Sequence, residues 1–104
     1  MVGLGLALAR PDRRIAVITG DGDVLMALGS LATIGVKQPK NLSIVCLDNA
    51  HYSASGMQPS ATKSGVDLGG AAHLMLPPGG AASGREHRGV RGDAVPCQVS
   101  VLRS

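Results

Sequence analysis

Residues 15–49, IAVITGDGDVLMALGSLATIGVKQPKNLSIVCLDN, decide the fold of this chain. Ile15 to Thr19 and Leu42 to Leu47 are short apolar runs rich in β-branched residues, a pattern typical of strands covered on both faces. Asp23 to Lys37 is dominated by Leu, Met and Ala and lacks proline, so it predicts the crossover helix of a βαβ unit. Because such crossovers are nearly always right-handed, the two strands are expected to be parallel. The predicted fold class is α/β.

Polar residues stand at the carboxyl ends of both predicted strands. Gly20-Asp21-Gly22 follows the first strand, and Asp48-Asn49 ends the second. If the strands are neighbours, Asp21 and Asn49 converge on one crevice about 5 Å across. Carboxylate and amide oxygens suit magnesium, and Gly22 with the start of the following helix suits a diphosphate. The pattern therefore predicts a metal–diphosphate site.

A simpler interpretation exists for each motif alone. Asp-Gly is a common turn dipeptide, and an asparagine after a strand commonly forms an Asx turn. The joint pattern of strand, GDG, helix, proline-marked loop, strand and asparagine favours the site.

Residues 20–52, GDGDVLMALGSLATIGVKQPKNLSIVCLDNAHY, resemble the thiamine diphosphate-binding motif of the thiamine-dependent enzymes. That motif begins with GDG and ends, after a helix and a strand, with an asparagine in a short polar loop. The resemblance continues through YSASGMQPSATKSGVDL and is greatest to 2-oxo acid decarboxylases of the phosphonopyruvate and sulfopyruvate type. It covers roughly residues 1–68. The resemblance implies part of the C-terminal, parallel-sheet cofactor-binding domain.

The resemblance implies a magnesium ion and three ligands for it. Asp21 and Asn49 would each give a side-chain oxygen. His51 would give its backbone carbonyl, so its imidazole has no part in binding.

The resemblance also implies a binding loop for the diphosphate of thiamine diphosphate. Gly20, Gly22 and Asp23 would hold the diphosphate mainly through the main chain, and Tyr52 would pack beside this loop. The related enzymes often carry glycine, an acidic residue and a hydroxyl residue after this tyrosine. Ser53-Ala54-Ser55 stand there in this chain, so the substrate is not assigned.

The expected function is magnesium-dependent thiamine diphosphate binding within a 2-oxo acid decarboxylase, a carbon–carbon lyase. By resemblance the enzyme needs a pyrimidine-binding domain or subunit in trans, usually in a homo- or hetero-oligomer, and no catalytic residue is assigned in this chain. We therefore expect the isolated chain, as a fragment or subunit, to be inactive. Two alternatives stay open: a non-catalytic remnant and a nucleotide-binding α/β module.

The segment after Leu68 changes in character. Residues 69–104 are rich in Gly, Ala, Pro and Arg and lack a helical period, so we predict an irregular or disordered C-terminal tail after a partial cofactor-binding domain at 1–68. Only Val95 to Leu102 alternates like a strand. We hypothesise that the tail is an out-of-frame translation of a GC-rich gene. Translating the downstream nucleotides in the other two frames tests this idea.

The composition of the chain limits which classes of function are expected. The chain has 104 residues, enough for one small domain, and a net charge of +3. Four of the ten Lys and Arg residues follow Leu68, and no basic stripe is interleaved with aromatic residues, so nucleic-acid binding is not expected. The apolar residues 1–9 are too few for a membrane span. The two cysteines form no CxxC pair, and we expect reduced thiols in a cytoplasmic protein.

Three further patterns lead to specific expectations. Gly3 to Leu8 could begin a dinucleotide fingerprint, but a Gly/Ala-rich helix packed against the sheet and ending near Arg10-Pro11 is favoured. The crossover helix has apolar residues on nearly every face, so Met26 is expected in the core. His51 with Ser53 or Ser55 lacks the acidic partner of a hydrolase triad, so we do not expect one.

Overall fold

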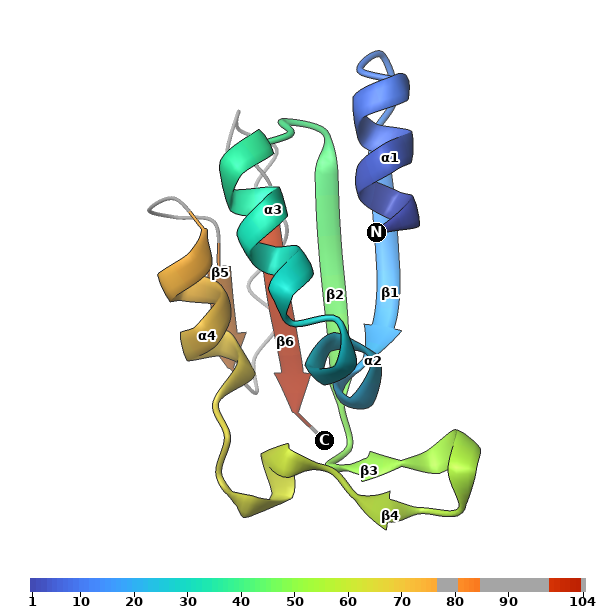
Figure 1. Ribbon diagram of the computed structural model, residues 1–104, viewed down its shortest axis with the longest axis vertical. Coiled ribbons are helices and arrows are strands. Elements are labelled where there is room, and N and C mark those ends of the chain that lie inside the picture. Colours follow the sequence, from blue (N-terminus) through green and yellow to red (C-terminus); the bar gives the residue numbers. More distant parts are fainter. Residues whose placement is uncertain (77–80, 85–97, 104) are drawn as a thin grey trace.

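The computed structural model describes residues 1–76, 81–84 and 98–103 of the chain. Four strands form one sheet in the order β1-β2-β6-β5 (Figure 1). All three pairings in this sheet are parallel. The predicted α/β fold with a parallel sheet is therefore confirmed. The strand bounds are β1 (Ile15–Gly20), β2 (Leu42–Asp48), β5 (Ala81–Gly84) and β6 (Gln98–Arg103).

The two strands predicted from the sequence are neighbours. β1 and β2 pair in register from Ile15 opposite Leu42 to Gly20 opposite Leu47. Their carboxyl ends consequently lie side by side, and the residues that follow Gly20 and Leu47 start from the same edge of the sheet. This confirms the geometry on which the predicted site depends.

The crossover between these strands consists of two helices. α2 (Asp21–Met26) begins directly after β1, and α3 (Gly29–Lys37) follows it. The prediction of one continuous helix from Asp23 to Lys37 is wrong in two respects. The helical structure begins at Asp21, and it is interrupted between Met26 and Gly29. At this interruption the backbone hydrogen bonds span three residues, as in a 3₁₀ helix: the Ser30 N–H donates to the Ala27 carbonyl at 2.9 Å. The break lets α2 end beside the strand tips while α3 runs along the sheet.

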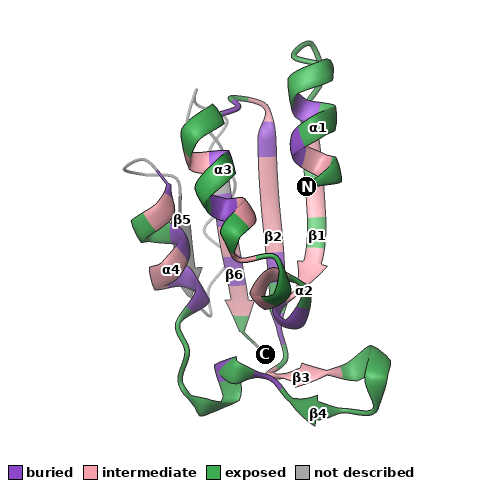
Figure 2. Cartoon of the chain, viewed as in Figure 1, coloured by how far each residue is buried: buried purple, intermediate pink, exposed green. Residues whose placement is uncertain are grey.

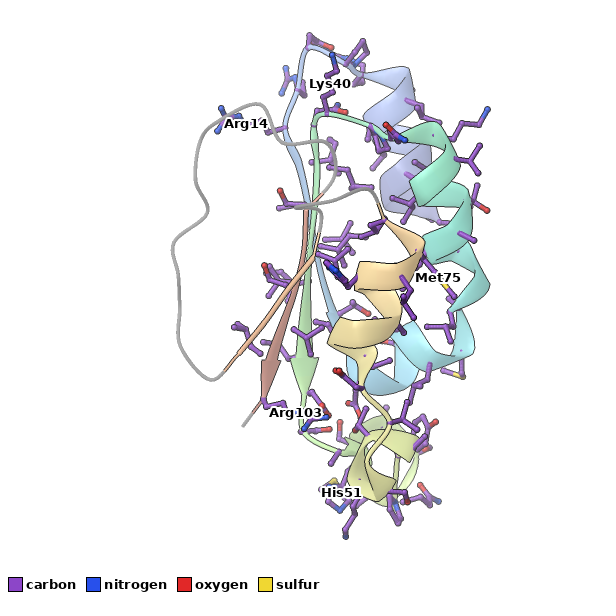
Figure 3. All side chains as sticks on the ribbon, turned by 90° about the vertical axis from the view of Figure 1, so that its left-hand side faces the viewer. Arg14, Lys40, His51, Met75 and Arg103 are labelled. Carbon is purple, nitrogen blue, oxygen red and sulfur yellow. The ribbon has the colours of Figure 1, made fainter. Side chains whose placement is uncertain are left out.

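The described helices lie on one face of the sheet (Figure 3). They are α1 (Val2–Ala9), α2, α3 and α4 (Leu68–Met75), and their buried residues meet those of β2 and β6 in the core (Figure 2). The expectation that both strands are covered on both faces differs from the described structure, because Ile18 is 73% and Leu47 50% exposed. Side chains alternate along a strand, so Val17 faces the helices while Ile18 faces away. The main core cluster comprises Leu4, Ala7, Leu31, Ile34, Leu42, Ala72, Leu76 and Val99.

The crossover helices bury only part of their apolar surface. Leu31 and Ile34 on α3 belong to the core. Met26 and Val36 are 74% and 80% exposed, so the prediction that Met26 lies in the core is wrong for this chain. The reason is geometric: each helix turns one side to the sheet, and the opposite side meets no described element.

The N-terminal segment is the predicted helix. α1 packs on β1 through Gly3, where a Cβ would collide with Cγ2 of Val17, and the chain leaves the helix at Arg10. The dinucleotide fingerprint is wrong, because Gly3 and Gly5 lie inside a helix and not in a turn between a strand and a helix. Of the described helices, none has the length and apolar character needed to cross a bilayer.

The described part of the segment after Leu68 contains regular structure. α4 follows Asp67, and β5 and β6 complete the sheet, so these stretches differ from the predicted irregular tail. β6 confirms the described part of the strand predicted over Val95 to Leu102, since its side chains Val99 and Val101 are buried. Residues 77–80, 85–97 and 104 lie outside the described residues. The division of the chain at Leu68 and the out-of-frame origin stay predictions.

A small hairpin lies beyond the carboxyl end of the sheet. β3 (His51–Tyr52) pairs antiparallel with β4 (Gln58–Pro59), with the short 3₁₀ helix η1 (Ser53–Ser55) between them. A second 3₁₀ helix, η2 (Ala61–Ser64), follows β4 (Figure 1). The polar stretch from Ala50 to Ser64 therefore forms an ordered hairpin followed by η2.

Candidate functional site

An open cavity of about 660 Å³ lies where β1 and β2 end. Its walls come from the end of β1, from α2 and from the hairpin, and His51 marks this end of the molecule, opposite Lys40 (Figure 3). All the residues predicted to bind cofactor or metal line it, which means that the fold gathers them in one place. They are Gly20, Asp21, Gly22, Asp23, Asn49, His51 and Tyr52.

Asp21 is the buried acid of this site. It is the first residue of α2, is 1% exposed, and lines the cavity. Its Oδ2 accepts a hydrogen bond from the Ser60 hydroxyl, and the Thr62 hydroxyl oxygen lies 3.1 Å from the same atom. Both of these hydroxyl contacts are with Oδ2, and neither involves Oδ1.

Asp48, the last residue of β2, is a second buried acid directly behind the site. Its Oδ1 accepts a hydrogen bond from the Thr62 hydroxyl at 2.7 Å and one from the Ala50 N–H at 3.0 Å. Its Oδ2 lies 3.0 Å from Nε of Arg103, the last residue of β6. Asp48 thus connects the hairpin and η2 to the middle of the sheet, and the cavity lining does not include it.

Asn49 forms an Asx turn with His51. The His51 N–H donates to Asn49 Oδ1 at 3.0 Å, and Nδ1 of the His51 ring donates to the Asn49 carbonyl at 2.9 Å. An amide oxygen has two lone pairs, so Oδ1 can accept this bond and still coordinate a cation. The simple Asx-turn interpretation and the ligand interpretation are therefore compatible.

The pairing of the hairpin orients the His51 carbonyl. The Ser60 N–H donates to the Ala50 carbonyl at 2.9 Å, so the next pair along, His51 opposite Pro59, is the non-hydrogen-bonded pair. In such a pair the N–H and C=O groups point away from the partner strand. Pro59 has no N–H to lose, which is why proline is tolerated there. The His51 carbonyl therefore points to the same side as its N–H, which contacts Asn49 Oδ1.

The ring of Tyr52 packs against Gly22. A Cβ at Gly22 would lie 2.5 Å from both Cδ1 and Cε1 of the ring, so any larger residue would displace it. This is the packing expected for Tyr52 beside the GDG turn. Asp23, in contrast, is exposed, and its Oδ2 accepts a 3.4 Å hydrogen bond from the Thr19 hydroxyl.

Cys46 lies close to these acids in β2. Burial, together with the negative charges of Asp21, Asp48 and Asp23, raises the pKa of the Cys46 thiol to about 11. The thiol therefore stays protonated at neutral pH and offers no thiolate nucleophile or metal ligand.

Sequence reasoning missed the groups that hold the two acids. It gives Ser60 and Thr62 no role in the site, and it places Arg103 in an irregular tail. All three contact buried carboxylates. A local signal was present only in the short Ser60-Ala61-Thr62 sequence, which by itself is common in loops.

Comparison with known proteins agrees with this architecture. Residues 2–87 match the family described as "Thiamine pyrophosphate enzyme, C-terminal TPP binding domain". Subunit beta of sulfopyruvate decarboxylase from Methanocaldococcus jannaschii is 48% identical over 67 residues, which is 64% of this chain and 35% of the relative. Phosphonopyruvate decarboxylase from Streptomyces viridochromogenes is 51% identical over 67 residues, 64% of this chain and 16% of the relative.

A more distant relative has a different name. Subunit KorB of 2-oxoglutarate synthase from Methanocaldococcus jannaschii is 36% identical over 58 residues, 56% of this chain and 22% of the relative. The matches thus span about a third or less of the length of these three relatives. The family match includes the cavity residues and runs past Leu68. The resemblance is confirmed: the chain belongs to the thiamine pyrophosphate enzymes, through their C-terminal TPP-binding domain.

Proposed function

We propose that this chain binds thiamine diphosphate together with Mg²⁺ in the cavity at the ends of β1 and β2, as part of a 2-oxo acid decarboxylase. The observation that carries the proposal is the convergence of the GDG turn, Asn49 and the β3 hairpin on one cavity. Family membership supports the cofactor, and the names of the sulfopyruvate and phosphonopyruvate decarboxylases support the reaction class.

The available donors fit a magnesium ion. Asp21 Oδ1, Asn49 Oδ1 and the His51 carbonyl are all hard oxygen donors at the cavity, and Mg²⁺ takes few protein ligands when it also binds phosphates. Within the described residues no three His, Cys, Asp or Glu side chains are grouped to hold a metal. A cation here therefore depends on mixed side-chain and main-chain oxygens, and on the phosphate oxygens of its ligand.

The diphosphate would bind at the GDG turn. Gly20 is extended immediately before α2, so the first N–H groups of the helix, from Asp21 to Asp23, open towards the cavity end. The helix dipole contributes only about 0.3–1 kcal/mol to anion binding, so the cation must neutralise most of the charge. Tyr52 occupies the space beside Gly22 and holds the turn in place.

When bound, thiamine diphosphate supplies the carbanion and electron sink that decarboxylation of a 2-oxo acid requires. The role of this chain is to hold the diphosphate end and orient the cofactor, and we assign it no catalytic residue. We infer that a pyrimidine-binding domain or subunit completes the site in an oligomer, which agrees with the name "subunit beta" of the relatives. The isolated chain should then bind the cofactor without turning over a 2-oxo acid.

A thermal shift measurement tests the proposal. Thiamine diphosphate with MgCl₂ at 100 times its Kd should stabilise the full chain by about 2.7 kcal/mol, and EDTA should abolish the shift. Asp21→Ala should also abolish it, whereas Asp12→Ala, which removes only the exposed ion pair with Arg10 at the other end of the sheet, should not.

The same measurement separates the alternatives. A shift caused by a dinucleotide, but not by thiamine diphosphate with magnesium, would identify a nucleotide-binding module. The lack of a cooperative melting transition in the isolated chain would favour the non-catalytic remnant. A shift retained in Asp21→Ala would place the ligand elsewhere and contradict the proposed site.

A further inference from the structure

The Thr62 hydroxyl lies between two buried carboxylates. It is 3.1 Å from Oδ2 of Asp21 and 2.7 Å from Oδ1 of Asp48. Thr62 itself is 6% exposed and belongs to η2, far from both acids in the sequence. One short segment therefore contacts the acid at the end of β1 and the acid at the end of β2.

The number of hydroxyl protons limits the hydrogen bonds that Ser60 and Thr62 can donate to Asp21 and Asp48. Ser60 and Thr62 bring two hydroxyl protons, and their oxygens are 2.8 Å apart. The shortest contacts are Ser60 to Asp21 and Thr62 to Asp48, so each carboxylate can receive one proton. Both hydroxyl oxygens lie next to the same atom of Asp21, Oδ2, and therefore restrict how this carboxylate can turn.

The segment is in turn fixed to the backbone around it. The Ser60 N–H donates to the Ala50 carbonyl at 2.9 Å, and the Lys63 N–H to the Ser60 carbonyl at 3.1 Å. On the far side, Asp48 is paired with Arg103 of β6, whose guanidinium also lies 3.4 Å from the Val66 carbonyl. A continuous set of polar contacts thus runs from the cavity to the middle strand β6.

We propose that Thr62 is a positioning residue for the cation site: its hydroxyl lies within hydrogen-bonding distance of both Asp21 and Asp48 and can donate its one proton to either, so that the orientation of the Asp21 carboxylate depends on the Asp48–Arg103 pair. The inference rests on the proposed function, because the cation ligand is Asp21. It assigns no chemistry to Thr62, which does not line the cavity. Outer groups that orient metal ligands typically change metal affinity 10- to 100-fold when removed.

The test is the Kd for Mg²⁺ of the full chain saturated with thiamine diphosphate, measured by calorimetry. Thr62→Val keeps the shape of the side chain and removes its hydroxyl, and it should raise the Kd about 10- to 100-fold. Thr62→Ser keeps the hydroxyl and should restore a Kd near that of the wild type. Thr33→Val, the same substitution at an exposed position of α3, is the matched control and should leave the Kd unchanged.

A merely structural role would give a different result. Thr62→Val would then lower the unfolding midpoint without ligands but leave the Kd for Mg²⁺ of the folded molecules unchanged, and that outcome overturns the proposal. If Thr62→Val does not fold, Arg103→Gln at a half-exposed position serves instead. Arg103→Gln should also raise the Kd for Mg²⁺, and an unchanged Kd would likewise refute the proposal.

The two proposals fail in distinguishable ways. A wild-type chain that binds no thiamine diphosphate with magnesium overturns both. A wild-type chain that binds, with Thr62→Val binding equally well, overturns the positioning role alone.

Discussion

Replacing Gly22 with alanine should have two opposite effects on stability: a gain in helix propensity and a steric collision. Alanine is favoured over glycine by up to about 1 kcal/mol inside a helix. At Gly22, however, the new Cβ would lie 2.5 Å from two atoms of the Tyr52 ring. Forcing a methyl group into such a packed position costs about 1–3 kcal/mol, so the collision should dominate. We expect Gly22→Ala to lower the free energy of unfolding by about 0–3 kcal/mol.

Urea unfolding with a matched control isolates the collision. Gly5 lies in α1, and a Cβ added there would have no neighbour within 4 Å, so Gly5→Ala should stabilise the chain by up to about 1 kcal/mol. In a Tyr52→Ala background, Gly22→Ala should lose its penalty, giving a coupling energy of about 1–3 kcal/mol. If Gly22→Ala stabilises the chain as much as Gly5→Ala, the packing of Tyr52 on the GDG turn is refuted.

Two further predictions concern stability away from the cofactor. The Asn41 side-chain Nδ2 donates to the carbonyls of Ala7, Arg10 and Arg13 at 2.8–3.0 Å, so Asn41→Asp, which keeps the size and loses the donor, should cost at least about 1–3 kcal/mol in urea unfolding. An unchanged midpoint would show that this amide does not anchor the loop before β1. The raised pKa of Cys46 means that its thiol ionises in the unfolded chain near 9.0 but in the folded chain only near 11. The free energy of unfolding should therefore fall between these pH values, by at most about 1.4 kcal/mol per pH unit, and Cys46→Ala should remove that part of the slope.

The residue pattern predicted the βαβ unit and the meeting of Asp21, Gly22 and Asn49 at one site, whereas Asp23, His51 and Tyr52 were added by the family resemblance. Those predictions depend on local features: two β-branched runs, a proline-free helical stretch and short polar motifs directly at the strand ends. Once two such strands are parallel neighbours, Asp21 and Asn49 are at the same edge of the sheet whatever the rest of the chain does. The pattern could not show that the crossover breaks at Ala27, because Leu, Met and Ala favour a continuous helix.

Burial was less predictable than strand order. An apolar run indicates that a strand belongs in a sheet, but it does not say how many faces other elements cover. Ile18 and Met26 are therefore exposed in the described structure although their residue types favour the core. The same limit applies after Leu68, where a Gly- and Ala-rich composition hides α4 and β5.

The sequence by itself determined which acid and which amide meet at the strand tips, because those positions follow from chain order and strand direction. Only the tertiary structure decided how the acid is held. Ser60 and Thr62 reach Asp21 across 39 and 41 residues, and Arg103 reaches Asp48 across 55. Hydrogen bonds between residues so far apart leave no periodic signal in the chain, since they form only after the hairpin, η2 and β6 have packed around the ends of β1 and β2.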